Sequence, residues 1–323
     1  MKILITGGLG LIGHHVVKKF ETLYNDVVIV DNRTNYGFIP RAEIDYLVEE
    51  RSKGIKTKDI YDVDICDTVG MGWTFRKHQP DLVVHLASFP RQKAVNANPA
   101  MGARTMSEGL LNLLELSKQY EVDRFFYISS SMVYGDFKDD VREDAICNPI
   151  GQYGIMKLAG EWLVRDYQRR GIDYTIFRPS AVYGPLDVED RVISKFLLTA
   201  LRGQTLKVNG PEETLDFTFV DDAADGIVSA CITDATRNKT YNITKSHSKT
   251  LLAAAELAVK LVGRGTIDVQ GRDMDFPSRG ALNIDAARRD FGFDPKVDID
   301  EGFQRYLDWL RNSSYWKNDI YGR

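Results

Sequence analysis

The sequence of 323 residues predicts an α/β fold: a doubly wound parallel sheet with a smaller α+β region towards the C-terminus. Two observations predict this fold. Short runs rich in Val, Ile and Phe alternate with helix-like stretches, and these runs are apolar on both faces, as strands covered by helices are. After about Tyr183 the alternation gives way to mixed short strands and helices. Strand–helix alternation with right-handed crossovers builds a doubly wound sheet.

The strands expected in the sheet are Lys2–Thr6, Val27–Asp31, Asp81–Ala87, Arg124–Ser129 and Asp173–Arg178. The clearest helices between them are expected at Gly109–Tyr120 and Tyr153–Arg169. The second half is expected to contain strands at Leu206–Asn209 and Asp216–Val220 and a helix at Leu251–Leu261. We therefore expect one domain over residues 1–183 and a smaller region over 184–323 that lends some elements back to the sheet. The charged insertion at 35–56 is expected to be a solvated loop with a helix, and a segment that flanks the cofactor is the alternative.

Composition excludes several classes of protein. The hydrophobic fraction of 43% and the charged fraction of 27% are ordinary for a soluble globular chain. A net charge of −4 argues against nucleic acid or an anionic membrane as a partner. No apolar run approaches the ~20 residues of a membrane span, and Met1–Ile5 runs directly into a strand, which leaves no room for a signal peptide. Cys66, Cys147 and Cys231 lack metal-ligand spacing and indicate free thiols in the cytoplasm.

A glycine-rich turn follows the first strand and opens a helix at about Leu11. Gly7 permits the tight turn, Gly10 lets the backbone approach a pyrophosphate, and Gly13 lets the helix pack closely on the sheet. The helix N-terminus then directs its free N–H groups, beginning at Leu11 and Ile12, towards the phosphates. With a strand before it and a helix after it, this turn predicts a Rossmann-type dinucleotide site.

An aspartate closes the second predicted strand. Asp31 lies about 20 residues beyond the glycine turn, where a carboxylate accepts hydrogen bonds from both ribose hydroxyls. The same carboxylate repels a 2′-phosphate, so the sequence favours NAD over NADP, although Arg33 nearby weakens that preference.

A tyrosine and a lysine share one face of a predicted helix. Tyr153 and Lys157 stand four residues apart. An ammonium beside a phenol lowers its pKa from about 10, so the pair can move a proton from a sugar hydroxyl during hydride transfer. Upstream, Ser130 and Ser131 follow the strand that ends at Ser129, at the carboxyl edge where ligands bind in open α/β folds. A hydroxyl there can bind the reacting oxygen.

Further motifs run through most of the chain. They are Gly7, Gly10 and Gly13; Asp31-Asn32; Asp64-Ile65; His85-Leu86-Ala87; Ser130 with Val133-Tyr134-Gly135; Tyr153 with Lys157; Arg178-Pro179; Tyr183-Gly184-Pro185; Asp216-Phe217; Val220-Asp221-Asp222; Asp285; Phe291-Gly292-Phe293; and Pro295. In this set the chain resembles the nucleotide-sugar epimerases and dehydratases of the extended short-chain dehydrogenase/reductase superfamily, and most closely the UDP-hexose 4-epimerases.

The resemblance implies a bound NAD. Besides the glycine turn and Asp31, it implies cofactor contacts from Asn32, from Asp64 and Ile65 around the adenine, and from Leu86, Ala87 and Ser88 along the ribose and nicotinamide. It also assigns Tyr153 and Lys157 to the cofactor as well as to catalysis, and Ser130 to the catalytic hydroxyl position.

The two residues after Ser130 bear on the reaction. In the family, dehydratases carry Asp-Glu there, decarboxylases a glutamate at the second place, and 3,5-epimerases and fucose synthases a cysteine. Ser131 and Met132 supply neither an acid nor a thiol. The resemblance therefore favours 4-epimerisation of a nucleotide-diphosphate sugar through a 4-keto intermediate.

The substrate positions depart from the family. Ala181 stands where Asn is frequent, Leu215 where Arg contacts the diphosphate, and Met106 where an Asn near the nicotinamide is usual. Arg272 and Arg279 are candidates for the diphosphate contact, with an exposed loop pair as the alternative.

Five further polar residues could serve the site or have a purely structural role. Arg191 and Lys195 could meet an acidic group or form a solvated helix face. Asp221 and Asp222 are expected to cap a helix over Ala223–Cys231, and His85 to be a satisfied core histidine.

Two other readings of the function stay open: an NAD(P)-dependent dehydrogenase or reductase of a nucleotide sugar or small hydroxy compound, and a non-catalytic NAD-binding protein. The intact Ser130, Tyr153 and Lys157 set argues against the latter. The helices at Gly109–Tyr120 and Tyr153–Arg169 resemble those of the family's four-helix dimer interface, so a homodimer is expected.

Overall fold

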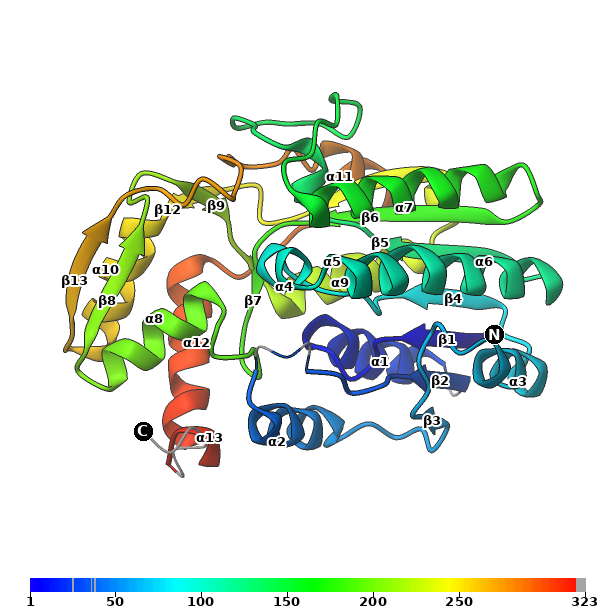
Figure 1. The fold of residues 1–323 in the computed structure, drawn as a ribbon, viewed down its shortest axis with the longest axis horizontal. Coiled ribbons are helices and arrows are strands. Elements are labelled where there is room, and N and C mark those ends of the chain that lie inside the picture. The colour runs from blue at the N-terminus through cyan, green and yellow to red at the C-terminus, as the bar shows by residue number, and fades with distance from the viewer. Residues whose placement is uncertain (25, 36, 38, 318–323) are drawn as a thin grey trace.

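The computed structural model describes residues 1–24, 26–35, 37 and 39–317. Within that range, seven strands form one parallel sheet in the order β11-β6-β5-β4-β1-β2-β3 (Figure 1). The strands are β1 (Lys2–Thr6), β2 (Asp26–Val30), β3 (Ile60–Tyr61), β4 (Leu82–His85), β5 (Arg124–Ile128), β6 (Asp173–Pro179) and β11 (Lys239–Ile243). The predicted doubly wound α/β fold is confirmed.

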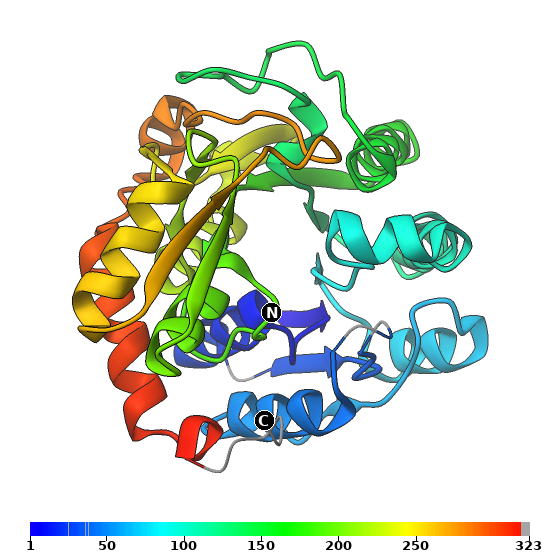
Figure 2. The same ribbon diagram turned by 60° about the vertical axis from the view of Figure 1, so that its left-hand side comes forward.

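Helices cover both faces of the sheet (Figure 2). One face packs against α1 (Leu11–Leu23), α9 (Val220–Cys231) and α11 (Asp285–Phe291). The other face packs against α3 (Thr68–His78), α6 (Gly109–Gln119) and α7 (Gln152–Gln168). Both cores are built from fully buried strand residues, for example Ile3 and Ile5 on one face and Leu4 on the other, which explains why these strands are apolar on both sides.

Short helices lie at the carboxyl edge of the sheet. They are α4 (Gln92–Ala97), α5 (Pro99–Ala103), the π-helical turn η1 (Arg104–Glu108) that leads into α6, and the 3₁₀ turn η2 (Ser131–Tyr134) after β5. A further 3₁₀ turn, η3 (Asp234–Thr236), precedes β11.

The smaller region has a core of its own, to the left of the sheet in Figure 1. It contains β7 (Val182–Tyr183), α8 (Val192–Leu201), β8 (Thr205–Asn209), β9 (Thr214–Asp216), β10 (Thr218–Phe219), β12 (Ser248–Thr250), α10 (Leu251–Val262), β13 (Thr266–Gln270), α12 (Ile299–Asn312) and α13 (Ser314–Lys317). Its strands pair as β8 with β13, β9 with β12 and β7 with β10.

The chain crosses between the two regions more than once. The strand β11 pairs in parallel with β6 and so returns from the second half of the chain to the sheet. The helices α9 and α11 return with it. One strand and two helices from the second half of the chain thus belong to the layers of the main sheet.

Two segments differ from what the sequence predicts. The segment predicted as one strand over Asp216–Val220 is split, and α9 begins at Val220. Asp221 and Asp222 therefore lie in the first turn rather than at the N-cap. The carboxylate of Asp222 instead accepts hydrogen bonds from the backbone N–H groups of Lys296 and Val297, which fixes the approach to α12.

The insertion at 35–56 was the second error. It contains α2 (Arg41–Ser52), whose Leu47 is fully buried in the core of the smaller region. The same helix carries a buried arginine, Arg51. The segment is therefore packed between the two regions rather than solvated along its whole length.

Candidate active site

The glycine turn has the close packing that the sequence predicts. Gly7 has a φ of 71°, and a Cβ there would lie 2.6 Å from the backbone nitrogen of Ala87. A Cβ on Gly13 would lie 2.1 Å from the carbonyl oxygen of Gly7. Gly10 is the N-cap of α1, and no side chain caps that helix end. The first N–H groups of α1, at Leu11 and Ile12, therefore remain available to an anion.

The aspartate after β2 lies against this turn. One oxygen of Asp31 accepts a hydrogen bond from the Leu9 backbone at 2.9 Å, and the other accepts from the Arg33 backbone at 2.8 Å. Burial raises the pKa of Asp31, and these two backbone N–H groups oppose the rise. The carboxylate is thus held beside the loop that would take the pyrophosphate.

The other predicted cofactor residues gather at the same edge. Asp64 accepts a hydrogen bond from the side chain of Asn32 at 3.2 Å, and Ile65 is buried against α6. The backbone nitrogens of Leu86 and Ala87 both donate to the carbonyl of Thr6, and Ser88 follows them. The whole set therefore surrounds one end of the sheet. These residues fit a dinucleotide, because Gly7 and Gly13 allow a close turn in which any Cβ would clash with backbone and Gly10 leaves the end of α1 without a side chain.

His85 is satisfied in the core, as expected. It is 3% exposed, and its Nδ1 lies 2.8 Å from the hydroxyl of Thr6. Burial lowers its pKa to about 3, which leaves it neutral.

The predicted catalytic residues meet at the end of β5. Tyr153 and Lys157 lie one turn apart near the start of α7, and the Lys157 nitrogen is 5.9 Å from the centre of the Tyr153 ring. Lys157 is 5% exposed and donates to the carbonyl of Ile128 at 2.7 Å. Ser130 is the N-cap of the turn η2, and its hydroxyl accepts a hydrogen bond from the backbone N–H of Met132.

The charges that act on Tyr153 differ from those that a Tyr153–Lys157 pair alone would give. Burial raises the pKa of the phenol, while Arg191, a hydrogen bond with Ser130 and the charge of Arg279 oppose that rise. Burial lowers the pKa of Lys157 to about 7, opposed by Glu161. The cations that favour the phenolate therefore line the cavity.

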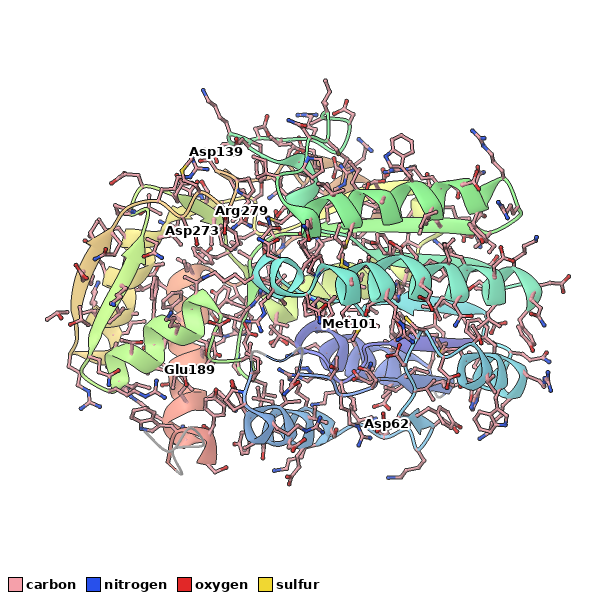
Figure 3. All side chains as sticks on the ribbon, in the orientation of Figure 1. Asp62, Met101, Asp139, Glu189, Asp273 and Arg279 are labelled. Carbon is pink, nitrogen blue, oxygen red and sulfur yellow. The ribbon has the colours of Figure 1, made fainter. Side chains whose placement is uncertain are left out.

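A cavity of about 400 Å³ opens in front of Ser130 and Tyr153. Its walls come from both regions of the molecule, and Figure 3 shows Asp273 and Arg279 at the junction between them. Such a junction is a frequent place for ligand sites. The cavity is lined by all four predicted substrate residues, namely Ser131, Arg191, Arg272 and Arg279.

Those four residues differ in how they are held. Ser131 is buried, and its hydroxyl bonds that of Ser180 at 3.2 Å. Arg272 is exposed and pairs with Glu213 at 3.3 Å. Arg191 is the N-cap of α8 and lines the cavity, with Asp187 at 3.8 Å as its ion-pair partner. Arg279 and Arg272 are not simply an exposed loop pair, because both face the cavity.

The residues that depart from the family pattern lie in two places. Ala181 and Leu215 line the cavity, at positions where the family pattern has an Asn and an Arg. Met106 is instead buried in an apolar cluster with Phe89, against which Tyr153 packs.

Sequence reasoning missed several cavity and support residues. Arg91 and Lys93 line the cavity from the segment around α4. Glu161 lies one turn beyond Lys157, is fully buried, and accepts from Arg178 and Ser129. The i, i+4, i+8 spacing of Tyr153, Lys157 and Glu161 could have revealed the last of these.

Arg51 is the other missed residue. Its fully buried guanidinium donates to the carbonyl of Leu9 in the glycine turn at 3.2 Å and to that of Leu186 at 2.6 Å. Leu186 precedes Asp187, which lines the cavity. One side chain thus joins the cofactor turn to the wall of the cavity.

Comparison with known proteins agrees with this geometry. Residues 3–244 match the NAD dependent epimerase/dehydratase family. The chain belongs to this family. NAD is accordingly its cofactor, as the glycine turn and Asp31 predict.

The relatives of this chain include both epimerases and dehydratases, the two kinds of enzyme in the family's name. A dTDP-glucose 4,6-dehydratase of Neisseria meningitidis is 29% identical and is matched over 99% of this chain and 96% of its own length. The structure of UDP-glucose 4-epimerase from Thermotoga maritima with UDP-glucose is 28% identical, with a TM-score of 0.84 over 96% of this chain and 99% of that one. The UDP-glucuronic acid 4-epimerase of Bacillus cereus is 26% identical, with a TM-score of 0.88 over the same shares.

Two further findings concern membrane-spanning helices and metal sites. No helix in the described part of the chain is long and apolar enough to cross a membrane. Residues 1–24, 26–35, 37 and 39–317 contain no group of three or more His, Cys, Asp or Glu side chains placed to hold a metal ion.

Proposed function

We propose that this chain inverts the configuration at C4 of a nucleotide-diphosphate sugar, with NAD recycled in each turnover. The observation that carries the proposal is the placement of Ser130 and Tyr153 in the wall of a cavity, with Lys157 one turn beyond Tyr153 on α7. The residues that follow Ser130, Ser131 and Met132, supply no acid or base. Inversion at C4 through a ketone needs only one proton-transferring group, and Tyr153 supplies it.

The residues of the chain have separate tasks in this reaction. Tyr153 takes the proton of the C4 hydroxyl and returns it, and Ser130 binds the same oxygen. Lys157, fixed on the carbonyl of Ile128, stabilises the phenolate and holds the cofactor ribose. The glycine turn and Asp31 bind the pyrophosphate and the adenosine ribose. When bound, NAD accepts a hydride from C4 and later returns it.

Dehydration is the main competitor, since relatives of both kinds resemble the chain to a similar degree. Loss of water from the sugar requires an acid beside the oxygen that leaves, and Ser131 and Met132 cannot provide one. Carboxylates line the cavity elsewhere, but Asp190 lies 2.6 Å from Arg91 and Glu213 lies 3.3 Å from Arg272. These two are engaged as counter-ions, whereas among the described residues Asp187 and Asp273 line the cavity with no Arg or Lys within hydrogen-bond distance. Epimerisation is favoured because no acid follows Ser130 directly.

The test is incubation with a panel of UDP- and dTDP-sugars, read by NMR, with Tyr153→Phe as the matched inactive control. We expect C4 inversion in the wild-type sample alone, without accumulation of NADH. A stoichiometric yield of NADH would establish a dehydrogenase instead, and a 4-keto-6-deoxy product a dehydratase. Unchanged activity in Tyr153→Phe would remove the assigned catalytic residue.

We also propose a homodimer through α6 and α7. Ile155 and Trp162 on α7 are 53% and 64% exposed, and Leu111 on α6 is 38% exposed. Large exposed apolar side chains on neighbouring helices mark contact surfaces. Sedimentation should show a dimer that Trp162→Glu converts to a monomer; a wild-type monomer at assay concentration would contradict it.

The three free cysteines, Cys66, Cys147 and Cys231, agree with the proposed cytoplasmic location.

A further inference from the structure

The cavity contains more positive charge than a diphosphate needs. Seven of its lining side chains are Arg or Lys and four are Asp or Glu, which leaves a surplus of three positive charges. The cations are Arg91, Lys93, Arg191, Lys195, Lys207, Arg272 and Arg279. The acids are Asp187, Asp190, Glu213 and Asp273. A diphosphate linking nucleoside and sugar brings two negative charges, so one positive charge remains unmatched.

The seven cations are not equally committed: some have a carboxylate partner within hydrogen-bond distance, and others do not. Arg91 and Arg272 have carboxylate partners at 2.6 and 3.3 Å. The nearest acid to Arg191 is Asp187, at 3.8 Å, which is too long for a hydrogen bond. Within the described residues, no carboxylate lies within 4 Å of the Arg279 guanidinium or the Lys93 nitrogen, and nothing accepts a hydrogen bond from the buried Nε of Arg279.

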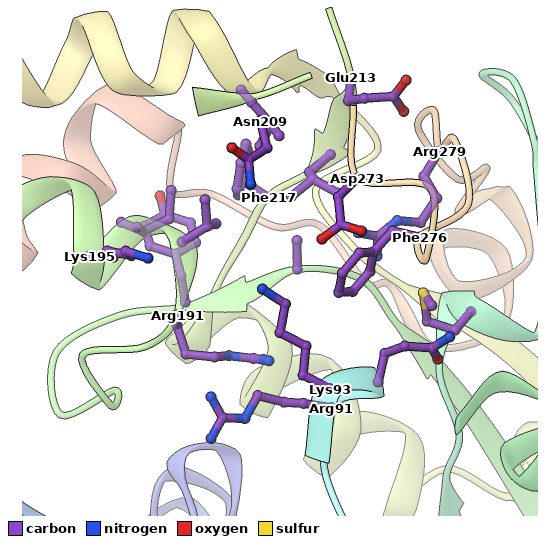
Figure 4. Close-up of a pocket in the computed structure, with 18 of the residues that line it drawn as sticks. Arg91, Lys93, Arg191, Lys195, Asn209, Glu213, Phe217, Asp273, Phe276 and Arg279 are labelled. Atoms are coloured by element: carbon purple, nitrogen blue, oxygen red, sulfur yellow. The ribbon is translucent and has the colours of Figure 1, made fainter. Parts of the chain in front are cut away.

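The uncommitted cations face the reacting end of the cavity. Arg191 and Arg279 are the two positive charges that oppose the rise in the pKa of Tyr153. Burial and, second, the charge of Arg191 lower the pKa of Arg279 to about 10. Both guanidiniums line the same cavity. Figure 4 shows Lys93 and Arg191 extending towards the middle of the cavity, with Arg279 on its far wall.

This arrangement is unfavourable around a neutral sugar. Two guanidiniums that line one cavity repel each other, and a buried N–H without an acceptor costs free energy. A carboxylate resolves both problems, because its two oxygens match the planar guanidinium and its charge neutralises the repulsion. Lys195, Lys207 and Arg272 remain for the diphosphate, where the apolar Leu215 offers no contact.

We propose that Lys93, Arg191 and Arg279 form a site for a carboxylate on the sugar itself, so that the preferred substrate is a nucleotide-diphosphate hexuronate. The inference rests on the proposed function only in that the cavity takes a nucleotide sugar with its reacting ring beside Tyr153.

The test compares the affinities of three ligands by calorimetry on the NAD-loaded Tyr153→Phe protein, whose turnover is expected to be far slower than that of the wild type. The ligands are UDP, UDP-glucose and UDP-glucuronate, with the dTDP series measured in parallel. We expect the glucuronate to bind at least about tenfold more tightly than the glucose, as one charge-assisted hydrogen bond allows. Arg279→Gln and Arg191→Gln should each reduce this ratio towards one while changing the affinity for UDP much less.

Lys207→Gln is the matched control, because Lys207 lines the same cavity from β8. It should weaken all three ligands to a similar degree and leave the ratio unchanged. Equal affinity for the two sugars would overturn the inference while leaving C4 epimerisation intact. Equal loss of UDP and UDP-glucuronate affinity in the arginine variants would assign these side chains to the diphosphate and also overturn it.

The remaining outcomes separate the two proposals. A preference for glucuronate without C4 inversion by the wild-type enzyme would support the carboxylate site and refute the proposed reaction. Failure of every UDP and dTDP ligand to bind would overturn both.

Discussion

Glu161 supports the catalytic helix from behind, and replacing it tests how the site is held. It lies one turn beyond Lys157 on α7 and is fully buried. Its carboxylate accepts hydrogen bonds from Ser129 at 2.6 Å and from Arg165 at 2.9 Å. Arg178 donates to both oxygens, at 2.9 and 2.7 Å. The carboxylate thus links the end of β5, α7 and β6 directly behind Ser130 and Lys157.

The magnitude follows from the burial of the pair. Burial alone would raise the pKa of Glu161, but its hydrogen bonds with Arg178 and Ser129 outweigh burial and hold the pKa below the ordinary value. Glu161→Gln keeps the shape but removes the charge, so Arg178, 2% exposed, is left without its counter-ion. Breaking a buried pair from one side costs about 3–5 kcal/mol. We expect that loss in the free energy of unfolding near neutral pH.

The pH dependence has a definite sign. Because the folded pKa of Glu161 is depressed, its contribution is fully present above the unfolded pKa of about 4.3 and is lost as the pH falls through the folded value. The Glu161→Gln variant should therefore differ most from wild type near neutrality. The difference should shrink on acidification below the unfolded pKa.

Urea denaturation measures this effect, and Glu301→Gln is the matched control. Glu301 pairs with Arg305 on α12, but both side chains are about half exposed, at 53% and 48%. That exposed pair should contribute less than about 1 kcal/mol. If Glu161→Gln were no more destabilised than Glu301→Gln, the reasoning would be refuted. Should the variant not fold, Ser129→Ala removes one hydrogen bond from the same carboxylate and should cost roughly 1–2 kcal/mol.

Three further predictions concern the site. Tyr153→Phe should lower kcat by about 10²–10⁴-fold, the range for loss of a proton-transferring group, with the Kd for NAD nearly unchanged; a similar kcat would exclude its role. Burial raises the pKa of Asp31, so affinity for NAD should decline on acidification at a higher pH than an ordinary aspartate would give, and Asp31→Asn should flatten that profile. An unchanged profile in that variant, measured by fluorescence titration, would contradict the assignment. Arg51→Met should raise the Kd for both NAD and the nucleotide sugar by roughly 5- to 100-fold, because two buried carbonyls lose their donor at about 1–3 kcal/mol; an effect on thermal stability alone would show that Arg51 does not couple the sites.

The parts of the fold that follow from local pattern could be predicted from the sequence. Five sheet strands were expected within one or two residues, because strands buried on both faces are continuous apolar runs. The helix α1 begins at Leu11 as expected, since the three glycines permit only a tight turn there. The strand β3 is only two residues long, Ile60–Tyr61, and so leaves no periodic signal.

Burial that depends on distant segments could not be predicted in this way. The charges of α2 are typical of a solvated helix, but Arg51 is buried by the loop at Leu186, 135 residues further along the chain. The proposed carboxylate site could not be predicted for the same reason. Lys93, Arg191 and Arg279 come from separate segments, and only the junction of the two regions brings them to one cavity. Ser130 and Tyr153 were easier, because parallel strands end at one edge.

The most direct test of the proposed reaction is the NMR spectrum of the products formed from UDP-glucuronate and UDP-glucose by the NAD-loaded wild-type enzyme. Epimerisation predicts a mixture of the two C4 epimers, with the C6 substituent intact and no NADH accumulating. A product that has lost water, or a ketone released together with NADH, would contradict the assignment of Ser130, Tyr153 and Lys157 to reversible chemistry at C4.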